Sequence, residues 1–205
     1  VNMSGTYSRA VACLTAALYV GSNASALDIR NNVLVNSLNN TNASGTSSRN
    51  FAIYSAAAST AFANINYNDY YVSGSQGMLG FIGSNRASVA NIATGFGGNT
   101  FSINVAPAFT SATDLHNTAT GLNAVGVAIS TVSEDYDGDV RCTSSCTGVD
   151  VPDMGADEFV PAGCAAVTIG TPTVTATTAT IPFTCTGCTP GNAFIAEYGA
   201  VSYTP

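Results

Sequence analysis

The predicted fold of this chain is decided by the stretch Asp135-Tyr-Asp-Gly-Asp-Val-Arg141 and by Pro152-Asp-Met-Gly-Ala-Asp-Glu-Phe159, which follows it closely. Eight of the twelve acidic residues lie between Glu134 and Glu158. Upstream of this stretch the chain consists of short β-prone runs, and downstream it alternates Thr with Val and Ile. The acidic stretch therefore indicates the place where one architecture ends and another begins.

The composition excludes two classes of partner. The 205 residues include no Lys and five Arg, and the formal net charge is -7. Nucleic acids and anionic membrane surfaces both require a basic face on the protein, so we expect neither as a partner. No apolar run approaches the roughly 20 residues of a membrane-spanning helix, and no membrane insertion is expected. Asn, Ser, Thr and Gly must supply the polar surface.

Short runs of β-branched and aromatic residues, separated by Gly, Asn and Ser, are typical of an all-β protein. A faint internal repeat accompanies them: Ile29-Arg-Asn-Asn-Val-Leu-Val35 aligns with Ile65-Asn-Tyr-Asn-Asp-Tyr-Tyr71. The alignment places Asn32 on Asn68. An Asn repeated at one corner of successive coils stacks through its side-chain amide and tolerates a left-handed backbone. The alternative is a chance match in a chain rich in Asn.

These residues carry a resemblance to a known family. The stretches 27–36, 51–54 and 64–71 resemble the last coils of secreted right-handed parallel β-helix proteins of the Bacteroidota type. The elements 107–109 and 114–116 resemble the continuation of that family's pattern, and the two acidic stretches resemble its closing motif. The resemblance implies that residues 1–160 are the C-terminal coils and cap of a parallel β-helix.

Residues 161–205 change in character. Thr and Ala alternate with Val and Ile between Val167 and Phe183, which is typical of sandwich strands. The segment resembles the start of a fibronectin type III-like domain, and Ala196-Glu-Tyr-Gly199 is similar to a run found in surface proteins of the same bacteria. We therefore expect an all-β chain in which a right-handed parallel β-helix, or solenoid, ends and a partial β-sandwich follows.

Six cysteines favour an oxidising, extracellular location. Cys142 and Cys146 form one closely spaced pair, and Cys185 and Cys188 form another, so two local disulfides are expected. The alternative is a zinc site made of these four thiolates, which would have to converge across the domain boundary. For Cys164 the alternatives are a disulfide with Cys13, a disulfide with a neighbouring cysteine and a free thiol.

The alternating carboxylates of Asp135, Asp137 and Asp139 surround a Gly that permits a tight turn. Such a turn can converge on a hard cation, and the sequence predicts calcium here. It is not an EF-hand loop, because the twelfth position is Cys146 rather than Glu. The alternative is a capped turn in which Asp accepts backbone N–H bonds and pairs with Arg141.

Tyr67, Tyr70 and Tyr71 are candidate glycan contacts, because aromatic ring faces stack on the C–H surfaces of sugars. The alternative is that these tyrosines pack inside the protein.

No catalytic residue is predicted. His116 is the only histidine, Asp114 is too near it in sequence to be a natural orienting group, and no Gly-x-Ser-x-Gly elbow is present. The carboxylates of Asp153, Asp157 and Glu158 are assigned to the closing strand rather than to a glycosidase cleft.

The leading hypothesis is a non-catalytic structural or adhesive module of a large secreted bacterial surface protein or fibre, located outside the cell or on its surface. An alternative is a lyase, hydrolase or glycan-binding protein whose active coils lie upstream. A third is a filament subunit that assembles by strand sharing. The expected partners are other copies, other surface proteins and glycans.

Overall fold

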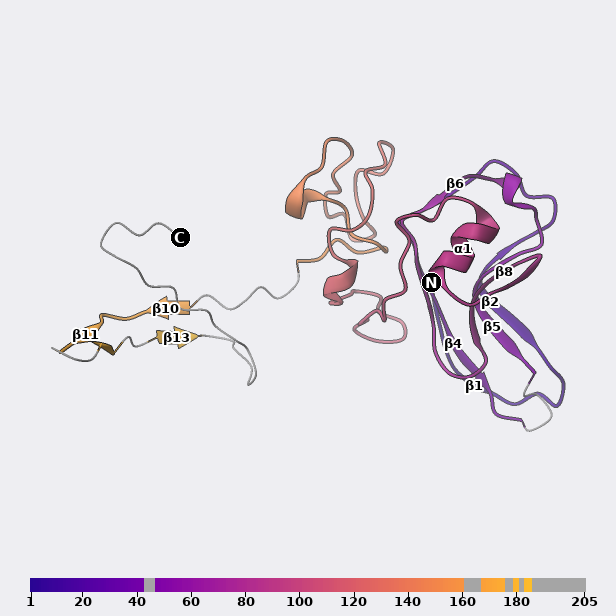
Figure 1. Ribbon diagram of the computed structural model, residues 1–205, viewed down its shortest axis with the longest axis horizontal. Coiled ribbons are helices and arrows are strands. Elements are labelled where there is room, and N and C mark those ends of the chain that lie inside the picture. The colour runs from indigo at the N-terminus through magenta and orange to yellow at the C-terminus, as the bar shows by residue number, and fades with distance from the viewer. Residues whose placement is uncertain (43–46, 161–166, 176–178, 181–182, 186–205) are drawn as a thin grey trace. The chain divides into compact units, whose positions relative to one another are not determined.

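The computed structural model describes residues 1–42, 47–160, 167–175, 179–180 and 183–185 (Figure 1). The chain divides into two compact units, Val1–Pro161 and Ala162–Pro205. Each unit is described by itself below.

In the first half of the first unit, strands pair in parallel with strands that follow them by 27 to 36 residues. One sheet has the order β1 (Asn2–Tyr7), β4 (Val33–Asn40), β7 (Asp69–Val72). A second has the order β2 (Leu14–Val20), β5 (Arg49–Ser55), β8 (Gly77–Ile82), β9 (Ser84–Arg86), and a third pairs β3 (Leu27–Arg30) with β6 (Phe62–Asn66). Strands far apart in sequence thus lie side by side, as β1 and β4 do in Figure 1.

Buried asparagines join these successive turns of chain. Asn68, which is fully buried, accepts hydrogen bonds from the backbone N–H of Asn32 at 3.1 Å and from its side-chain amide at 3.0 Å. Its own Nδ2 donates to the carbonyl oxygen of Ile29 at 2.9 Å. The alignment of Asn32 with Asn68 is therefore a real spatial contact. It satisfies backbone groups at a corner where the strands cannot.

One hydrophobic cluster fills the space between the sheets. Its buried members come from β4 to β8 and from α1 (Val89–Phe96): Leu34, Ala52, Ile53, Ile65, Tyr70, Leu79, Ile82, Ile92 and Phe96. On β2, β5 and β8, the rings of Tyr19, Tyr54 and Phe81 stack in a row, with centroid separations of 5.6 and 4.6 Å. Aromatic rings in register across neighbouring strands add to the stability of the ladder.

Parallel pairing in the second sheet ends at β8, because the chain reverses there. Gly83 has φ +63° and allows β9 to fold back antiparallel on β8. The helix α1 follows, with Ser88 as its N-cap: the Ser88 hydroxyl accepts a hydrogen bond from the N–H of Asn91 at 3.2 Å. The helix buries Ile92 and Phe96 against the core.

Residues 104–160 contain little regular structure and are held by side-chain contacts and by backbone hydrogen bonds between their turns. Within the first unit, short 3-10 turns occur at Ser59–Ala61, Thr120–Leu122 and Gly148–Asp150. Leu122 and Met154 pack on Val33 and Val35 in a second hydrophobic cluster. Asn31 bridges the two regions: its amide donates to the Val127 carbonyl at 2.7 Å, and its Oδ1 accepts from the Val127 N–H at 2.9 Å.

In the second unit, the described strands form two short antiparallel pairs. β10 (Val167–Ile169) pairs with β13 (Phe183–Cys185), and β11 (Thr173–Val174) pairs with β12 (Ala179–Thr180).

The predicted fold class, a right-handed parallel β-helix end followed by a partial β-sandwich in an all-β chain, is wrong. The described residues form five separate sheets of two to four short strands, parallel and antiparallel, together with an α-helix. The parallel pairs do not join into a closed or solenoid sheet. The physical reason is local: the hairpin at Gly83 and the Ser88-capped helix redirect the chain, and residues rich in Asp, Asn and Gly then replace strands with turns.

Within the described residues, no helix has the length and apolar character needed to cross a membrane.

We expect Asn68→Ala to lower the free energy of unfolding by about 3 kcal/mol, since it removes the acceptor of the Asn32 N–H and a donor to the Ile29 carbonyl oxygen at a buried corner. Urea unfolding followed by circular dichroism measures the change. The control is Asn85→Ala on the exposed strand β9, which should change stability by less than about 0.5 kcal/mol. Equal effects of the two variants would contradict the role given to Asn68.

The core also contains a carboxyl group. Asp69 is fully buried; its Oδ1 accepts the Val105 N–H at 2.8 Å, and its Oδ2 has no partner among the described residues. Burial raises the pKa of Asp69 from 3.8 to about 7, although the Val105 hydrogen bond opposes this shift. The folded protein therefore keeps the proton at pH values where the unfolded chain loses it.

Stability is expected to fall as pH rises from about 4 to about 7, by up to about 4 kcal/mol, because the raised pKa favours folding only while Asp69 is protonated. Asp69→Asn keeps an acceptor for Val105 and should flatten this part of the profile. Unfolding free energies at several pH values measure it. The exposed Asp150→Asn serves as the control and should leave the slope unchanged. A wild-type slope retained in Asp69→Asn would show that other groups cause it.

Candidate functional site

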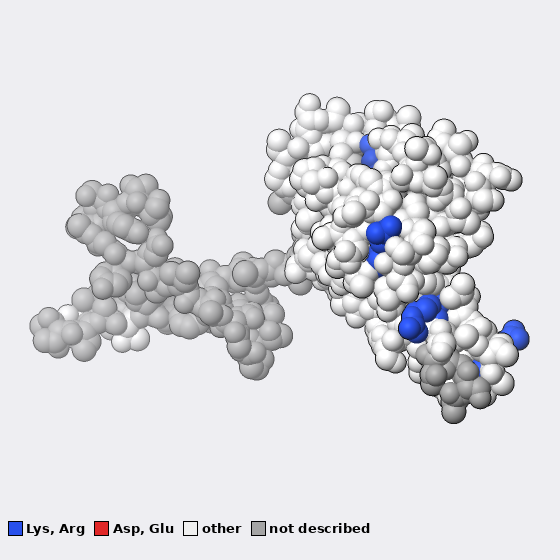
Figure 2. All heavy atoms as spheres, turned by 45° about the vertical axis from the view of Figure 1, so that its right-hand side comes forward, with Lys and Arg blue, Asp and Glu red and all other residues white. Residues whose placement is uncertain are grey.

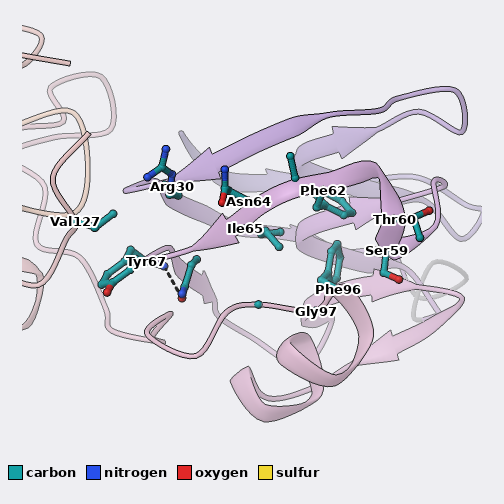
Figure 3. A pocket seen from close by; sticks show the side chains of 13 residues that line it. Arg30, Ser59, Thr60, Phe62, Asn64, Ile65, Tyr67, Phe96, Gly97 and Val127 are labelled. Carbon is teal, nitrogen blue, oxygen red and sulfur yellow. Dashed lines mark hydrogen bonds between the residues drawn. The ribbon is translucent and has the colours of Figure 1, made fainter. Parts of the chain in front are cut away.

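A groove runs beside strand β6, between this strand and the end of helix α1 (Figure 3). Its volume is about 470 Å³, within the roughly 300–1,000 Å³ of small-molecule sites. The side chains and backbone that line it are Arg30, Ser59, Thr60, Phe62, Ala63, Asn64, Ile65, Asn66, Tyr67, Phe96, Gly97, Gly98 and Val127.

Apolar residues occupy the middle of the groove and polar residues its rim. Phe62, Ile65 and Phe96 lie together in the centre of the view in Figure 3, and the rings of Phe62 and Phe96 meet edge to face at 5.4 Å. Arg30 and Asn64 point to the same side of the groove. This arrangement combines an apolar surface with a few directional hydrogen-bonding groups.

The charge of Arg30 is compensated within its own strand. Its Nε and Nη2 donate to the two carboxylate oxygens of Asp28 at 2.7 and 2.6 Å. The hydrogen bond from Arg30 lowers the pKa of Asp28, and the same bond raises the pKa of Arg30. Asn64 donates to Asp28 at 3.3 Å and adds to this network. The rim is therefore polar without net charge.

Tyr67 lies at one end of the groove, in a left-handed backbone conformation with φ +54°. Its ring stacks on Phe101 with a centroid separation of 5.0 Å, and its N–H donates to Oδ1 of Asn66 at 3.0 Å. The Asn66 oxygen also accepts the Phe101 N–H at 2.9 Å. One asparagine thus fixes the segments that carry both rings.

The three tyrosines predicted as glycan contacts separate in the structure. Tyr67 lines the groove and is partly exposed. Tyr70 is fully buried, and its hydroxyl donates to Oδ1 of Asn99 at 2.8 Å; burial raises its pKa above the usual range. Tyr71 is partly exposed and packs against the second hydrophobic cluster, as Tyr67 also does. Only Tyr67 of the three is placed to touch a ligand in the groove.

The three aspartates predicted to bind calcium also make different contacts. The Asp135 carboxylate accepts backbone N–H groups of Asp137, Asp139 and Glu158 at 2.8 to 2.9 Å. Partial burial opposes ionisation of Asp135, but these hydrogen bonds outweigh it and lower its pKa. Asp135 thus caps the turn, as the alternative interpretation expected. Calcium at Asp135, Asp137 and Asp139 stays a prediction, and the described residues do not bring these three carboxylates to one centre.

Asp137 instead lies beside His116. Its Oδ2 is 3.1 Å from Nε2 of His116, and the Asp114 Oδ1 is 2.5 Å from Nδ1. The hydrogen bond to Asp114, with the charges of Asp114 and Asp137, raises the pKa of His116. The expectation that Asp114 lies too near His116 in sequence to orient it is therefore wrong. Sequence reasoning missed the contact with Asp137 because that residue is distant in sequence.

Arg141 pairs with Glu158 rather than with the aspartate turn. Its Nε lies 3.2 Å from Oε1 of Glu158, an ion-pair distance without the alignment of a hydrogen bond, and its Nη2 donates to the Gly155 carbonyl at 2.9 Å. Asp153 accepts the N–H groups of Ala124 and Phe159 at 2.6 and 2.7 Å. These acidic residues therefore organise the loops around them.

The disulfide predicted between Cys142 and Cys146 is confirmed. These two cysteines therefore cannot serve as ligands of the alternative four-thiolate zinc site. Cys13 is a free thiol. For the second predicted pair, the side chain of Cys185 is not described, and Cys188 lies outside the described residues, as does Cys164.

No protein-family model, curated protein or solved structure matches this chain. Its function therefore has to be inferred from the geometry of its own residues.

Gly98 lines the groove and lies close to the backbone of β6. This residue has φ +57°, and a Cβ atom there would clash with the carbonyl oxygen of Ile65. We expect Gly98→Ala to destabilise the protein by about 1–3 kcal/mol more than Gly74→Ala. Gly74 also has positive φ, at +77°, but open space around it, so the difference isolates the clash. Thermal unfolding of both variants measures it, and equal melting temperatures would show that residues 97–98 move away freely.

Proposed function

We propose that this chain is a non-catalytic extracellular adhesive module that binds neutral glycans in the groove beside β6. The observation that carries the proposal is the combination of the Tyr67 ring with the side chains of Arg30 and Asn64 around one apolar floor. Sugars present apolar C–H faces and rings of hydroxyl groups. An aromatic face and planar amide or guanidinium groups complement these two features.

The electrostatics favour an uncharged ligand. The positive charge of Arg30 is compensated by its ion pair with Asp28, and the formal net charge of the chain is -7. Figure 2 shows a face on which arginine side chains are scattered and no acidic side chain is visible, within an otherwise uncharged surface. Among the residues that line the groove only Arg30 is charged, and Asp28 compensates it, so a polyanionic glycan would meet no concentrated positive charge there. Neutral oligosaccharides therefore fit better than uronates or sulfated chains.

The lining of the groove supports binding rather than hydrolysis. Among the described residues that line it, none is Asp, Glu, His or Cys. Glycoside hydrolysis requires two carboxyl groups on either side of the scissile bond, about 5 to 10 Å apart. The carboxylate of Asp28, which pairs with Arg30 at the rim, accepts hydrogen bonds from Arg30 and Asn64. A module of this kind holds its ligand without transforming it.

The extracellular location rests on the disulfide between Cys142 and Cys146, since such bonds persist in oxidising compartments. The surface built from Asn, Ser and Thr is consistent with a module of a secreted surface protein or fibre. The glycan is then the ligand through which the longer protein adheres.

Isothermal titration calorimetry with neutral and uronic-acid oligosaccharides tests the proposal. The wild-type chain should bind a neutral oligosaccharide. Tyr67→Ala and Asn64→Ala should each weaken binding about tenfold, since the loss of one stacking contact or one hydrogen bond corresponds to about 1–1.5 kcal/mol.

The matched control is Tyr136→Ala, which removes a tyrosine that is 87% exposed and lies outside the groove. Its affinity should equal that of the wild type. Absence of binding to every neutral oligosaccharide, or equal weakening by Tyr67→Ala and Tyr136→Ala, would contradict the proposal. Release of reducing sugar ends from the bound ligand would contradict the non-catalytic assignment.

A further inference from the structure

Three acidic or imidazole side chains from distant segments meet at one point of the first unit. Ligand atoms of His116, Asp137 and Asp157 all lie within 4.8 Å of one another. Nε2 of His116 is 3.1 Å from Oδ2 of Asp137. Two ligands bound to one zinc ion at about 2.0–2.1 Å lie about 3.3 Å apart at the tetrahedral angle, so this separation suits a shared ion.

We propose that His116, Asp137 and Asp157 form a binding site for a divalent first-row transition metal ion of the Zn²⁺ type. The donor set decides the class of ion. Imidazole nitrogen suits zinc, copper, iron and nickel, whereas calcium takes six to eight oxygen ligands. A site with one nitrogen and two carboxylate donors therefore differs from the calcium turn expected at Asp135, Asp137 and Asp139.

The histidine is oriented for this role by Asp114. Oδ1 of Asp114 lies 2.5 Å from the ring nitrogen Nδ1 of His116. The same oxygen accepts the backbone N–H of His116 at 3.2 Å. Histidines that bind metals through one ring nitrogen usually donate the other N–H to a carboxylate, which fixes the tautomer and the ring. Asp114 holds Nε2 toward the two aspartates and is a positioning residue.

Hydrogen bonds from neighbouring backbone groups also fix the carboxylate of Asp157 and the turn that carries Asp137. Asp157 is 9% exposed, and its Oδ2 accepts the N–H of Asn117 at 2.8 Å. Asp137 is fixed by the turn that Asp135 caps. The cluster is thus formed by backbone and side-chain contacts independent of the ion, and binding has only to draw donor atoms that lie within 4.8 Å of one another to about 3.3 Å.

An ion can reach the cluster from solvent. The side chains of His116 and Asp137 are 55% and 41% exposed, and a cavity of about 390 Å³ adjoins them. The segments that carry the ligands have little regular secondary structure among the described residues. Metal bound here would tie residues 114–117, 135–139 and 155–157 together and stabilise this part of the chain, since a ligand of the folded state raises stability.

Calorimetry with Zn²⁺ on the full chain tests the proposal, together with the absorption spectrum of Co²⁺ as a probe of coordination. The wild type should bind one ion, and His116→Ala and Asp137→Asn should each weaken binding at least tenfold. Asp114→Asn should weaken it by about 10- to 100-fold and shift the Co²⁺ spectrum, while the melting temperature without metal changes little.

The matched control is Asp139→Asn, which removes the same charge from the same turn and from the predicted calcium set. It should bind Zn²⁺ as the wild type does. Zn²⁺ binding that His116→Ala leaves unchanged would overturn the proposal. So would Ca²⁺ binding that depends on Asp139 but not on His116, and so would the absence of Zn²⁺ binding, since the cluster would then be an ion pair only.

Discussion

The structure depends on asparagine side chains that satisfy buried backbone groups between successive turns of chain. Parallel strands leave their connecting corners without ladder hydrogen bonds, and an unpaired buried N–H or C=O group is costly. Asn68 meets this need by accepting the N–H of Asn32 and donating to the carbonyl oxygen of Ile29. Asn31 likewise donates to the carbonyl oxygen of Val127. The groove beside β6 lies next to one of these corners, because Tyr67, which lines the groove, stands between the end of β6 and Asn68.

Relations that a sequence spacing reveals were predicted well, and contacts that depend on how the chain folds back on itself were predicted poorly. The repeat that aligned Asn32 with Asn68 and the Cys142–Cys146 disulfide were visible, since each depends on spacing alone. The helix α1 was missed although Ser88 caps it, because eight residues give too short an apolar pattern. The predicted solenoid was wrong because the hairpin of β8 and β9, the helix α1 and loops follow, and the parallel pairs form separate sheets.

The candidate site shows the same limit. Tyr67, Tyr70 and Tyr71 are indistinguishable by residue type, yet Tyr70 is buried, whereas Tyr67 and Tyr71 are partly exposed and only Tyr67 lines the groove. Neighbouring residues on a strand point to opposite faces, and which face is buried depends on the helix and loops that pack there. In the same way, His116 meets Asp137 and Asp157 only because the loops after residue 104 fold back on one another.

The most direct test of the central claim is a ¹⁵N-edited NMR titration of the whole chain with a neutral oligosaccharide. Binding in the groove beside β6 predicts that chemical-shift changes concentrate at residues 62–67 and 97–98, which line it. Changes concentrated elsewhere, or a spectrum that no neutral oligosaccharide alters, would contradict the account.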